Sequence, residues 1–484
     1  MKSVFASASA RGSSSVMRTH CARFAMPACR ARDAAGWRAS HWHRIRSSAA
    51  DETRWRRQGF LPVALVVALL VAGCTHPRGP GVTLRFWAMG REGEVVQELI
   101  RDFERENADV KVEVQQMPWS AAHEKLLTAF VGNATPDVAQ LGNTWIAEFA
   151  ALEALEPLGP RLAAAAPAYF SGIWDTNIVD GTLYGVPWYV DTRLLFYRRD
   201  LLERAGYDRM PQDWQTWRQA LVALKRSAGE NRFAVLLPSN EFAPLVAFGL
   251  QAGSPLLADS ATLGAFSEPA FRRAFEFYQG LFRDHLAPPV SNNEIANIYQ
   301  EFARGYFAMF ITGPWNLGEL ERRLPPELKD AWQTAPLPGP EGPASGVSLA
   351  GGSSLVQFHR SRHQAAGAKL IEFLSRPEQQ IRFYRLTGDL PARREAWRDS
   401  GLANDPRVRA FGEQLSRVVP TPKVPEWELI ASRIQDHAER VIRGAARPES
   451  ALADLDRDVT RILEKRRWLL ERRARSSGAA AAPP

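Results

Sequence analysis

The sequence predicts an α/β protein of two lobes with a ligand cleft between them. Expected strands and amphipathic helices alternate over residues 82–152 in the order βαβαβα, which is typical of a parallel sheet covered by helices. Two later segments, 183–202 and 306–317, are rich in aromatic and β-branched residues, as buried strands are. We interpret both segments as places where the chain crosses between the lobes.

The first lobe is expected to contain three strand–helix units. Its strands are expected at 82–88, 110–114 and 137–141, and its helices at 92–106, 119–131 and 145–152. Ligands of open α/β sheets bind at the carboxyl ends of the strands. The loops at those ends contain five candidate ligand contacts, namely Glu92, Trp119, Asn143, Thr144 and Trp145.

Segment 183–202 combines carboxylate, guanidinium and aromatic chemistry. Asp191 and Arg193 are two apart on an expected strand and therefore point to the same face. Tyr189 and its neighbour Trp188 offer flat apolar rings beside them. Such groups can bind a polyol, because charged groups hydrogen-bond paired hydroxyls while rings cover the C–H face of a pyranose. The alternative is a buried Asp–Arg ion pair near a strand edge, and this segment alone leaves both open.

Two further stretches supply candidate contacts. Residues 306–317 form an expected strand that ends in a Gly-Pro turn, with Trp315 exposed just beyond it. Gly351, Gly352 and Ser353 lie in an expected strand–turn–strand, where glycines let backbone N–H groups approach a ligand closely. Nucleotide binding is not indicated, because the sequence contains no GxGxxG and no GK[ST] motif after these glycines.

Taken in order and spacing, the Thr-Pro-Asp-Val of 135–138 and the segments 183–202 and 306–317 resemble the periplasmic-type solute-binding proteins of ABC importers. More narrowly, they are similar to the branch that binds maltose, trehalose and related oligosaccharides. The resemblance runs from about residue 82 to about residue 462. It implies a type II-like periplasmic-binding-protein fold of two α/β lobes, joined by hinge crossings, that closes on a sugar.

The resemblance also implies partners and one further contact. The partners are a sugar, membrane permease subunits and a separate ATPase; the protein itself is expected to be a monomer without cofactor or metal. An aromatic residue at the position of Trp427 stacks on the sugar in the maltose-binding relatives, so we expect the same role here. Relatives commonly carry an Asp in the third loop, where this chain has Asn143 and Thr144, so the fine specificity is not implied.

The expected lobes are discontinuous in sequence. One comprises residues 82–189 plus 312–357, and the other residues 190–311 plus 358–465. The three crossings are expected near residues 190, 310 and 358. Residues 466–484 are a basic stretch followed by an Ala-Pro tail, and we expect disorder there from the composition.

The basic character of the chain comes from its leader. The formal net charge is +8, but residues 1–73 hold 12 Lys and Arg against 3 Asp and Glu, which leaves about −1 for the remainder. Nucleic acid binding is therefore not implied. A basic region around residues 54–57 precedes an apolar run over 60–72, which is shorter than the roughly 20 residues of a membrane-spanning helix.

This run ends in Val71-Ala72-Gly73-Cys74, which resembles a bacterial lipoprotein signal with Cys74 as the acylated residue. The alternative is a short buried helix that ends at a chance cysteine. We expect an exported protein whose lipid at Cys74 holds it to a membrane on the periplasmic or extracytoplasmic side. Residues 74–81 would be the tether, and no second cysteine would remain for a disulfide.

An enzyme has to be weighed against a binding protein. The sequence contains no HExxH, GxSxG or CxxC motif, so no catalytic constellation is indicated. Glu92 and Asp191 are expected on opposite lobes and could flank a glycosidic bond, as the two carboxylates of a glycosidase do. We favour a sugar-binding subunit, and the alternatives are a glycoside-processing enzyme and a lipoprotein scaffold without a transport role.

Overall fold

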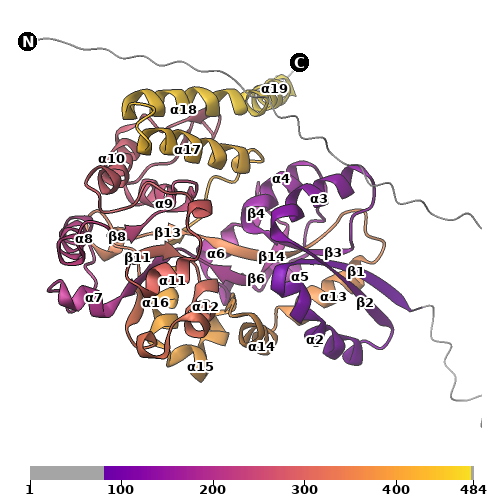
Figure 1. Ribbon diagram of the computed structural model, residues 1–484. Coiled ribbons are helices and arrows are strands. Elements are labelled where there is room, and N and C mark those ends of the chain that lie inside the picture. Colours follow the sequence, from indigo (N-terminus) through magenta and orange to yellow (C-terminus); the bar gives the residue numbers. More distant parts are fainter. Residues whose placement is uncertain (1–80, 481–484) are drawn as a thin grey trace, which may run out of the picture. The chain divides into compact units, whose positions relative to one another are not determined.

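The computed structural model describes residues 81–480, which belong to one compact unit. Two sheets with covering helices organise this unit (Figure 1). The leader, most of the expected tether and the expected acylation site Cys74 lie outside the described residues. Within 81–480, no helix has the length and apolarity that a bilayer crossing requires.

The first sheet has six strands in the order β15-β6-β14-β3-β1-β2. Their bounds are β1 Val82–Met89, β2 Val110–Met117, β3 Val138–Gly142, β6 Gly185–Asp191, β14 Gly351–Gln357 and β15 Leu390–Pro391. β1 pairs in parallel with β2 and β3, whereas β14 runs antiparallel between β3 and β6. The predicted parallel sheet is present, with late strands added at one side.

Helices cover both faces of this sheet because the side chains of β1 alternate between two apolar clusters. Leu84 and Phe86 pack on the same cluster as Phe103, while Trp87 and Met89 belong to the other cluster. The helices and short strands of this part are α2 Gly90–Glu106, α3 Trp119–Val131, α4 Ile146–Ala151, α5 Pro160–Ala163, α6 Ser171–Asp175, β4 Ile178–Val179, β5 Thr182–Leu183, α13 Gln364–Leu374 and α14 Pro377–Thr387.

The second sheet has four strands in the order β12-β7-β11-β8. They are β7 Leu194–Arg198, β8 Phe233–Leu236, β11 Phe307–Thr312 and β12 Trp332–Ala335. Trp214 and Trp217 of α8 (Trp214–Ala228) are buried in its core, as their helical spacing predicts. Around this sheet lie α7 Arg199–Arg204, α9 Ala243–Gln251, β9 Leu257–Ala258, β10 Leu263–Gly264, α10 Pro269–Arg283, α11 Ile298–Ala303, α12 Trp315–Arg323, α15 Ser400–Ala403 and α16 Pro406–Leu415.

The strands place the crossings differently from the sequence expectation. The first crossing falls between Asp191 and Leu194, as expected near 190. The predicted crossing back to the first lobe near residue 312 is wrong. β11 is a fully buried inner strand of the second sheet, and β12 still pairs with β7. The chain rejoins the first sheet only with β14, and β15 still pairs with β6. The third crossing therefore follows Pro391 instead of lying near 358.

Three helices end the described chain: α17 Trp427–Ile442, α18 Pro448–Ile462 and α19 Glu464–Ala480. A short parallel pair joins β13 (Ser348–Leu349) to β16 (Val418–Val419) before them. The expectation of disorder from residue 466 is wrong as far as Ala480, because α19 is helical. Its Arg, Lys, Leu and Glu residues are good helix formers, so propensity outweighs the polar composition there.

At Gly352 the backbone of β14 lies very close to the backbone of β6. It has φ +123°, and an added Cβ would lie 2.3 Å from the carbonyl oxygen of Tyr189. Gly181, with φ +77° and no atom within 4 Å of its added Cβ, is the matched control. Gly181→Ala should lower the free energy of unfolding by about 1–2 kcal/mol, because alanine disfavours the left-handed backbone. Gly352→Ala should lower it by about 1–3 kcal/mol more, because the added Cβ clashes with the Tyr189 carbonyl oxygen. Urea unfolding measures both, and equal losses would contradict the close approach.

Candidate functional site

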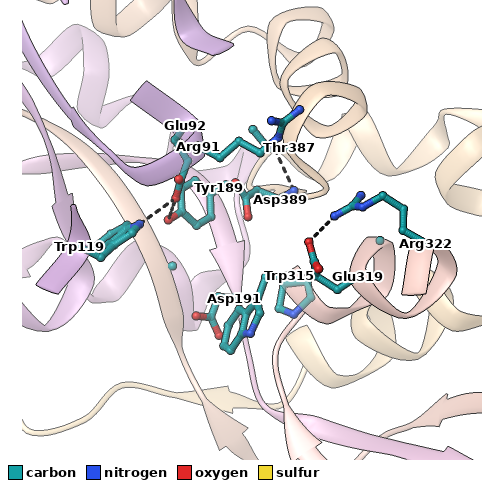
Figure 2. Close-up of a pocket in the computed structure, with 13 residues that line it drawn as sticks. Arg91, Glu92, Trp119, Tyr189, Asp191, Trp315, Glu319, Arg322, Thr387 and Asp389 are labelled. Atoms are coloured by element: carbon teal, nitrogen blue, oxygen red, sulfur yellow. Dashed lines mark hydrogen bonds and ion pairs between the residues drawn. The ribbon is translucent and has the colours of Figure 1, made fainter. Parts of the chain in front are cut away.

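A cavity of about 500 Å³ lies where the carboxyl ends of β1 and β6 face helix α12 (Figure 2). The first sheet and its loops contribute Arg91, Glu92, Trp119, Tyr189, Asp191 and Gly352. The opposite side comes from the β11–α12 connection and helix α12, with Pro314, Trp315, Gly318, Glu319 and Arg322. Thr387, the last residue of α14, and Asp389, in the turn between α14 and β15, complete the lining.

Glu92 is the most connected carboxylate of the cavity. It is 7 % exposed at the start of α2, and its Oε1 accepts hydrogen bonds from Tyr189 Oη at 2.9 Å and Trp119 Nε1 at 3.2 Å. Gln140 Nε2 lies 3.5 Å from the same oxygen. Burial and the neighbouring Glu92 raise the pKa of Tyr189 well above its ordinary value, so Tyr189 stays a hydrogen-bond donor.

Asp389 was not predicted from the sequence, although it faces the same cavity. Burial, together with the nearby charges of Glu92 and Asp191, raises the pKa of Asp389 to about 8. Its backbone N–H donates to Thr387 Oγ1 at 3.0 Å (Figure 2), and Gly388 before it has φ +88° at the end of α14. A Gly-Asp turn after a helix is the local signal, but it does not reveal that the turn reaches the cleft.

Asp191 and Arg193 form the ion pair that the sequence left as an alternative. Arg193 Nη1 donates to Asp191 Oδ1 at 2.6 Å, and Arg193 Nε lies 3.6 Å from Glu241 Oε1. The guanidinium carbon is 4.7 Å from the ring centroid of Trp315. Asp191 lines the cavity and Arg193 does not, so Arg193 acts on the site through Asp191 and Trp315.

The two predicted tryptophans of the cavity stand on opposite sides of it. Trp315 is 41 % exposed and Trp119 is 36 % exposed, so both rings offer surface to a ligand. Trp145 packs edge-on against Trp119 with ring centroids 5.7 Å apart, and it does not line the cavity. Trp145 therefore supports the orientation of Trp119.

The third loop contributes less than expected. Asn143 is buried and its Nδ2 donates to Thr176 Oγ1 at 2.8 Å. The Thr144 hydroxyl donates to Glu428 of α17. Neither residue lines the cavity, so in this arrangement both serve contacts within the protein.

The glycine segment is split between the cavity and the sheet. Gly352 lines the cavity, and a Cβ added to Gly351 would lie 3.4 Å from Asp191 Oδ1. Ser353 is fully buried, and its hydroxyl donates to the carbonyl oxygen of Leu141 at 3.0 Å. We therefore assign Ser353 to strand pairing and Gly352 to the cavity wall.

Trp427 is not at the cavity. It begins α17, is 1 % exposed, and packs in the core of the second sheet, with its ring 6.2 Å from that of Phe242. This placement corrects the stacking role that we expected from the resemblance, because a ring buried among apolar side chains offers no face to a ligand.

Glu319 and Arg322 are further lining residues that the sequence analysis missed. They follow Trp315 on α12 at i+4 and i+7, so all three lie on one helix face, and Arg322 donates to Glu319 (Figure 2). That spacing was available from the sequence. In the described part of the chain, no group of three or more His, Cys, Asp or Glu could hold a metal ion.

Comparison with known proteins identifies the class. Residues 88–381 match the family of bacterial extracellular solute-binding proteins, and the chain belongs to this family. Its members bind a solute and are not enzymes, and the architecture is the α/β periplasmic-binding-protein fold. The resemblance inferred from the sequence motifs is thereby confirmed.

Three proteins illustrate the similarity. The structure of the sugar-binding protein MalE from Xanthomonas citri is 51 % identical, with a TM-score of 0.78, and the match covers 81 % of this chain and 99 % of that one. An ABC transporter solute-binding protein of Thermotoga lettingae, bound to α-D-tagatose, is 28 % identical with a TM-score of 0.67, covering 79 % and 100 %. An uncharacterized lipoprotein of Streptomyces antibioticus is 29 % identical over 75 % of this chain and 84 % of its own.

The raised pKa of Asp389 predicts a pH-dependent stability. The folded protein retains the Asp389 proton up to about pH 8, whereas the unfolded chain releases it near 3.8. The fold therefore binds more protons in this window, and its free energy of unfolding should fall as pH rises from about 4 to about 8. Asp389→Asn should flatten this dependence in thermal melts, and Asp208→Asn, at an exposed position, should retain it. Identical pH profiles for all three proteins would contradict the protonated Asp389.

Proposed function

We propose that the protein is the sugar-binding subunit of an ABC importer and captures a disaccharide or oligosaccharide of the trehalose or maltose type. One observation carries the proposal. The cavity combines the rings of Trp119, Tyr189 and Trp315 with carboxyl groups on both of its sides. This is the chemistry that a ligand with hydroxyls at its rim and C–H groups on its faces requires.

The dimensions and charges of the cavity agree with that ligand. A volume of about 500 Å³ falls in the range of about 300–1,000 Å³ that small-molecule sites occupy. Four acidic side chains line it, Glu92, Asp191, Glu319 and Asp389, and each offers acceptors to sugar hydroxyls. Arg91 and Arg322 supply donors and oppose part of the negative charge. An anionic ligand would face more carboxyl groups than guanidinium groups.

The relatives point in the same direction. The Xanthomonas citri protein is described as sugar-binding, and the Thermotoga lettingae structure contains a monosaccharide. The cavity and the motif resemblance support the trehalose or maltose type.

We infer a hinge closure as the mechanism of capture. The links between the two sheets are residues 192–193, 336–350 and 392–405, and rotation about them would bring α12 towards β1 and β6. A sugar that contacts both sides stabilises the closed form over the open form. The closed form would then deliver the sugar to permease subunits, with ATP hydrolysis by a separate protein. The monomeric state expected from the resemblance fits this role.

Calorimetric titration with trehalose, maltose and maltotriose tests the proposal. An indole stacked on a sugar covers a third to a half of its roughly 150–250 Å², which at about 25 cal/mol per Å² contributes on the order of 1–3 kcal/mol. Trp119→Ala and Trp315→Ala should each weaken binding about ten- to a hundred-fold by this term. Trp468→Ala, at an exposed position outside the cavity, is the control. Wild-type affinity in both cavity variants would exclude the stacking roles, and no heat with any of the sugars would exclude the ligand class.

A lipid anchor at Cys74 is the second part of the proposal. It rests on the Val-Ala-Gly-Cys motif and on the similarity to a lipoprotein of Streptomyces antibioticus. Acyl chains at roughly 0.8 kcal/mol per buried CH₂ would keep the exported protein at the membrane. Cys74→Ser should leave the protein unprocessed or release it, as fractionation and intact mass measure. A wild-type protein that retains residues before Cys74 would contradict the anchor.

A further inference from the structure

The C-terminal helix α19 has a charge and a surface that sugar binding does not explain. Residues 464–475 contain six Lys and Arg against two Glu, a net charge of +4. The chain from residue 74 onward carries about −1 in total, so its remaining residues sum to about −5. Residues 464–475 are thus net positive, while the rest of the chain after the leader is net negative.

One stripe of α19 combines this charge with apolar side chains. Lys465, Trp468, Leu469, Arg472 and Arg475 follow one another at helical spacing, and all five are exposed. Trp468 is 50 % exposed and Leu469 is 39 % exposed, so the stripe presents two adjacent apolar side chains to solvent. The guanidinium of Arg472 lies 5.3 Å from the ring centroid of Trp468. Glu464 and Glu471 stand at the flank of the stripe.

The helix is joined to the rest of the protein mainly through its first turn. Arg466 Nε donates to the carbonyl oxygen of Ala261 at 3.2 Å, and Leu463 just before the helix is fully buried. Residues 471–475 are all exposed, so this part of α19 extends beyond the packed core. Figure 1 shows α19 continuing from the end of α18, and none of the cavity-lining residues belongs to α19.

We propose that α19 docks on an anionic phospholipid surface, with the cationic side chains of the stripe on lipid phosphates and Trp468 among the headgroups. Clustered Lys and Arg are attracted to anionic lipid within about a Debye length. Tryptophan is favoured at the lipid–water interface because its ring is apolar and its N–H is polar.

The chemistry of the stripe favours lipid over a protein partner. A protein interface pairs charges one by one at fixed positions, which requires cationic groups held in place. Beyond the first turn, α19 is exposed and presents long cationic side chains around two apolar ones. Such a pattern suits a surface of many mobile phosphates. An acidic segment of a membrane protein is the competing occupant, and protein-free vesicles separate the two.

The test is co-sedimentation of the protein with vesicles. The chain starting at His76 is suitable, because residues 81–480 belong to one compact unit and the match to the MalE structure covers 99 % of the MalE chain. Vesicles of phosphatidylcholine with about a third phosphatidylglycerol should sediment the protein, and pure phosphatidylcholine should not. Added salt should release it, since the attraction is screened.

Matched variants assign the binding to the stripe. The triple change Lys465→Gln, Arg472→Gln and Arg475→Gln keeps helix propensity while removing three charges, and should weaken vesicle binding about ten-fold or more. The control removes three exposed arginines elsewhere, namely Arg101, Arg209 and Arg226, each changed to Gln. Trp468→Ser should weaken binding at unchanged charge.

Failure of the lipid proposal is distinguishable from failure of sugar binding. No sedimentation with phosphatidylglycerol vesicles, or equal sedimentation with both vesicle types, would overturn it. So would equal binding by the stripe variant and the control. Sugar titration of the same samples should give the same affinity in wild type and stripe variant, because α19 does not line the cavity.

Discussion

The site depends on a partly buried guanidinium where the chain passes from one sheet to the other. Arg193 lies between the end of β6 and the start of β7, and it contacts Asp191, Glu241 and the ring of Trp315. A charge in such a place is tolerated only when carboxylates surround it, and removal of one partner leaves the others uncompensated. Arg193 thereby fixes a carboxylate of the first lobe and a tryptophan of the second at one position.

The carboxyl groups of the cavity form a second constraint. Glu92 is held by Tyr189 and Trp119, and Asp191 is held by Arg193, so each has one oxygen engaged by the protein. Asp389 has no such cation, which is why burial raises its pKa. A neutral Asp389 can donate a hydrogen bond as well as accept one, and Glu92 Oε1 and Asp191 Oδ1 act as acceptors in the hydrogen bonds above. The site thus offers both kinds of hydrogen bond to a hydroxyl group.

The sequence located much of the site because its signals are local. Glu92 and Trp119 follow strands whose ends meet at one sheet edge, and Asp191 ends strand β6 within the aromatic segment 183–202. Asp389 was not predicted because it reaches the cavity only through the pairing of β15 with β6, and these two strands are about 200 residues apart in sequence. Trp427 was misplaced because its stacking role was carried over from the relatives by position, whereas here the ring at the start of α17 is buried in the core of the second sheet.

By itself the sequence determined the α/β class, the order of the elements, the family and six of the thirteen residues of the cavity wall. Alternation of apolar residues specifies strands and helices, and a motif such as Gly-Pro-Trp carries its geometry in the backbone. Only the tertiary structure decided where the second and third crossings fall, that Arg193 pairs inside the protein, and that Asp389 joins the site. These facts depend on which strands become neighbours, and strand neighbours are chosen by burial over the whole chain and not by local pattern.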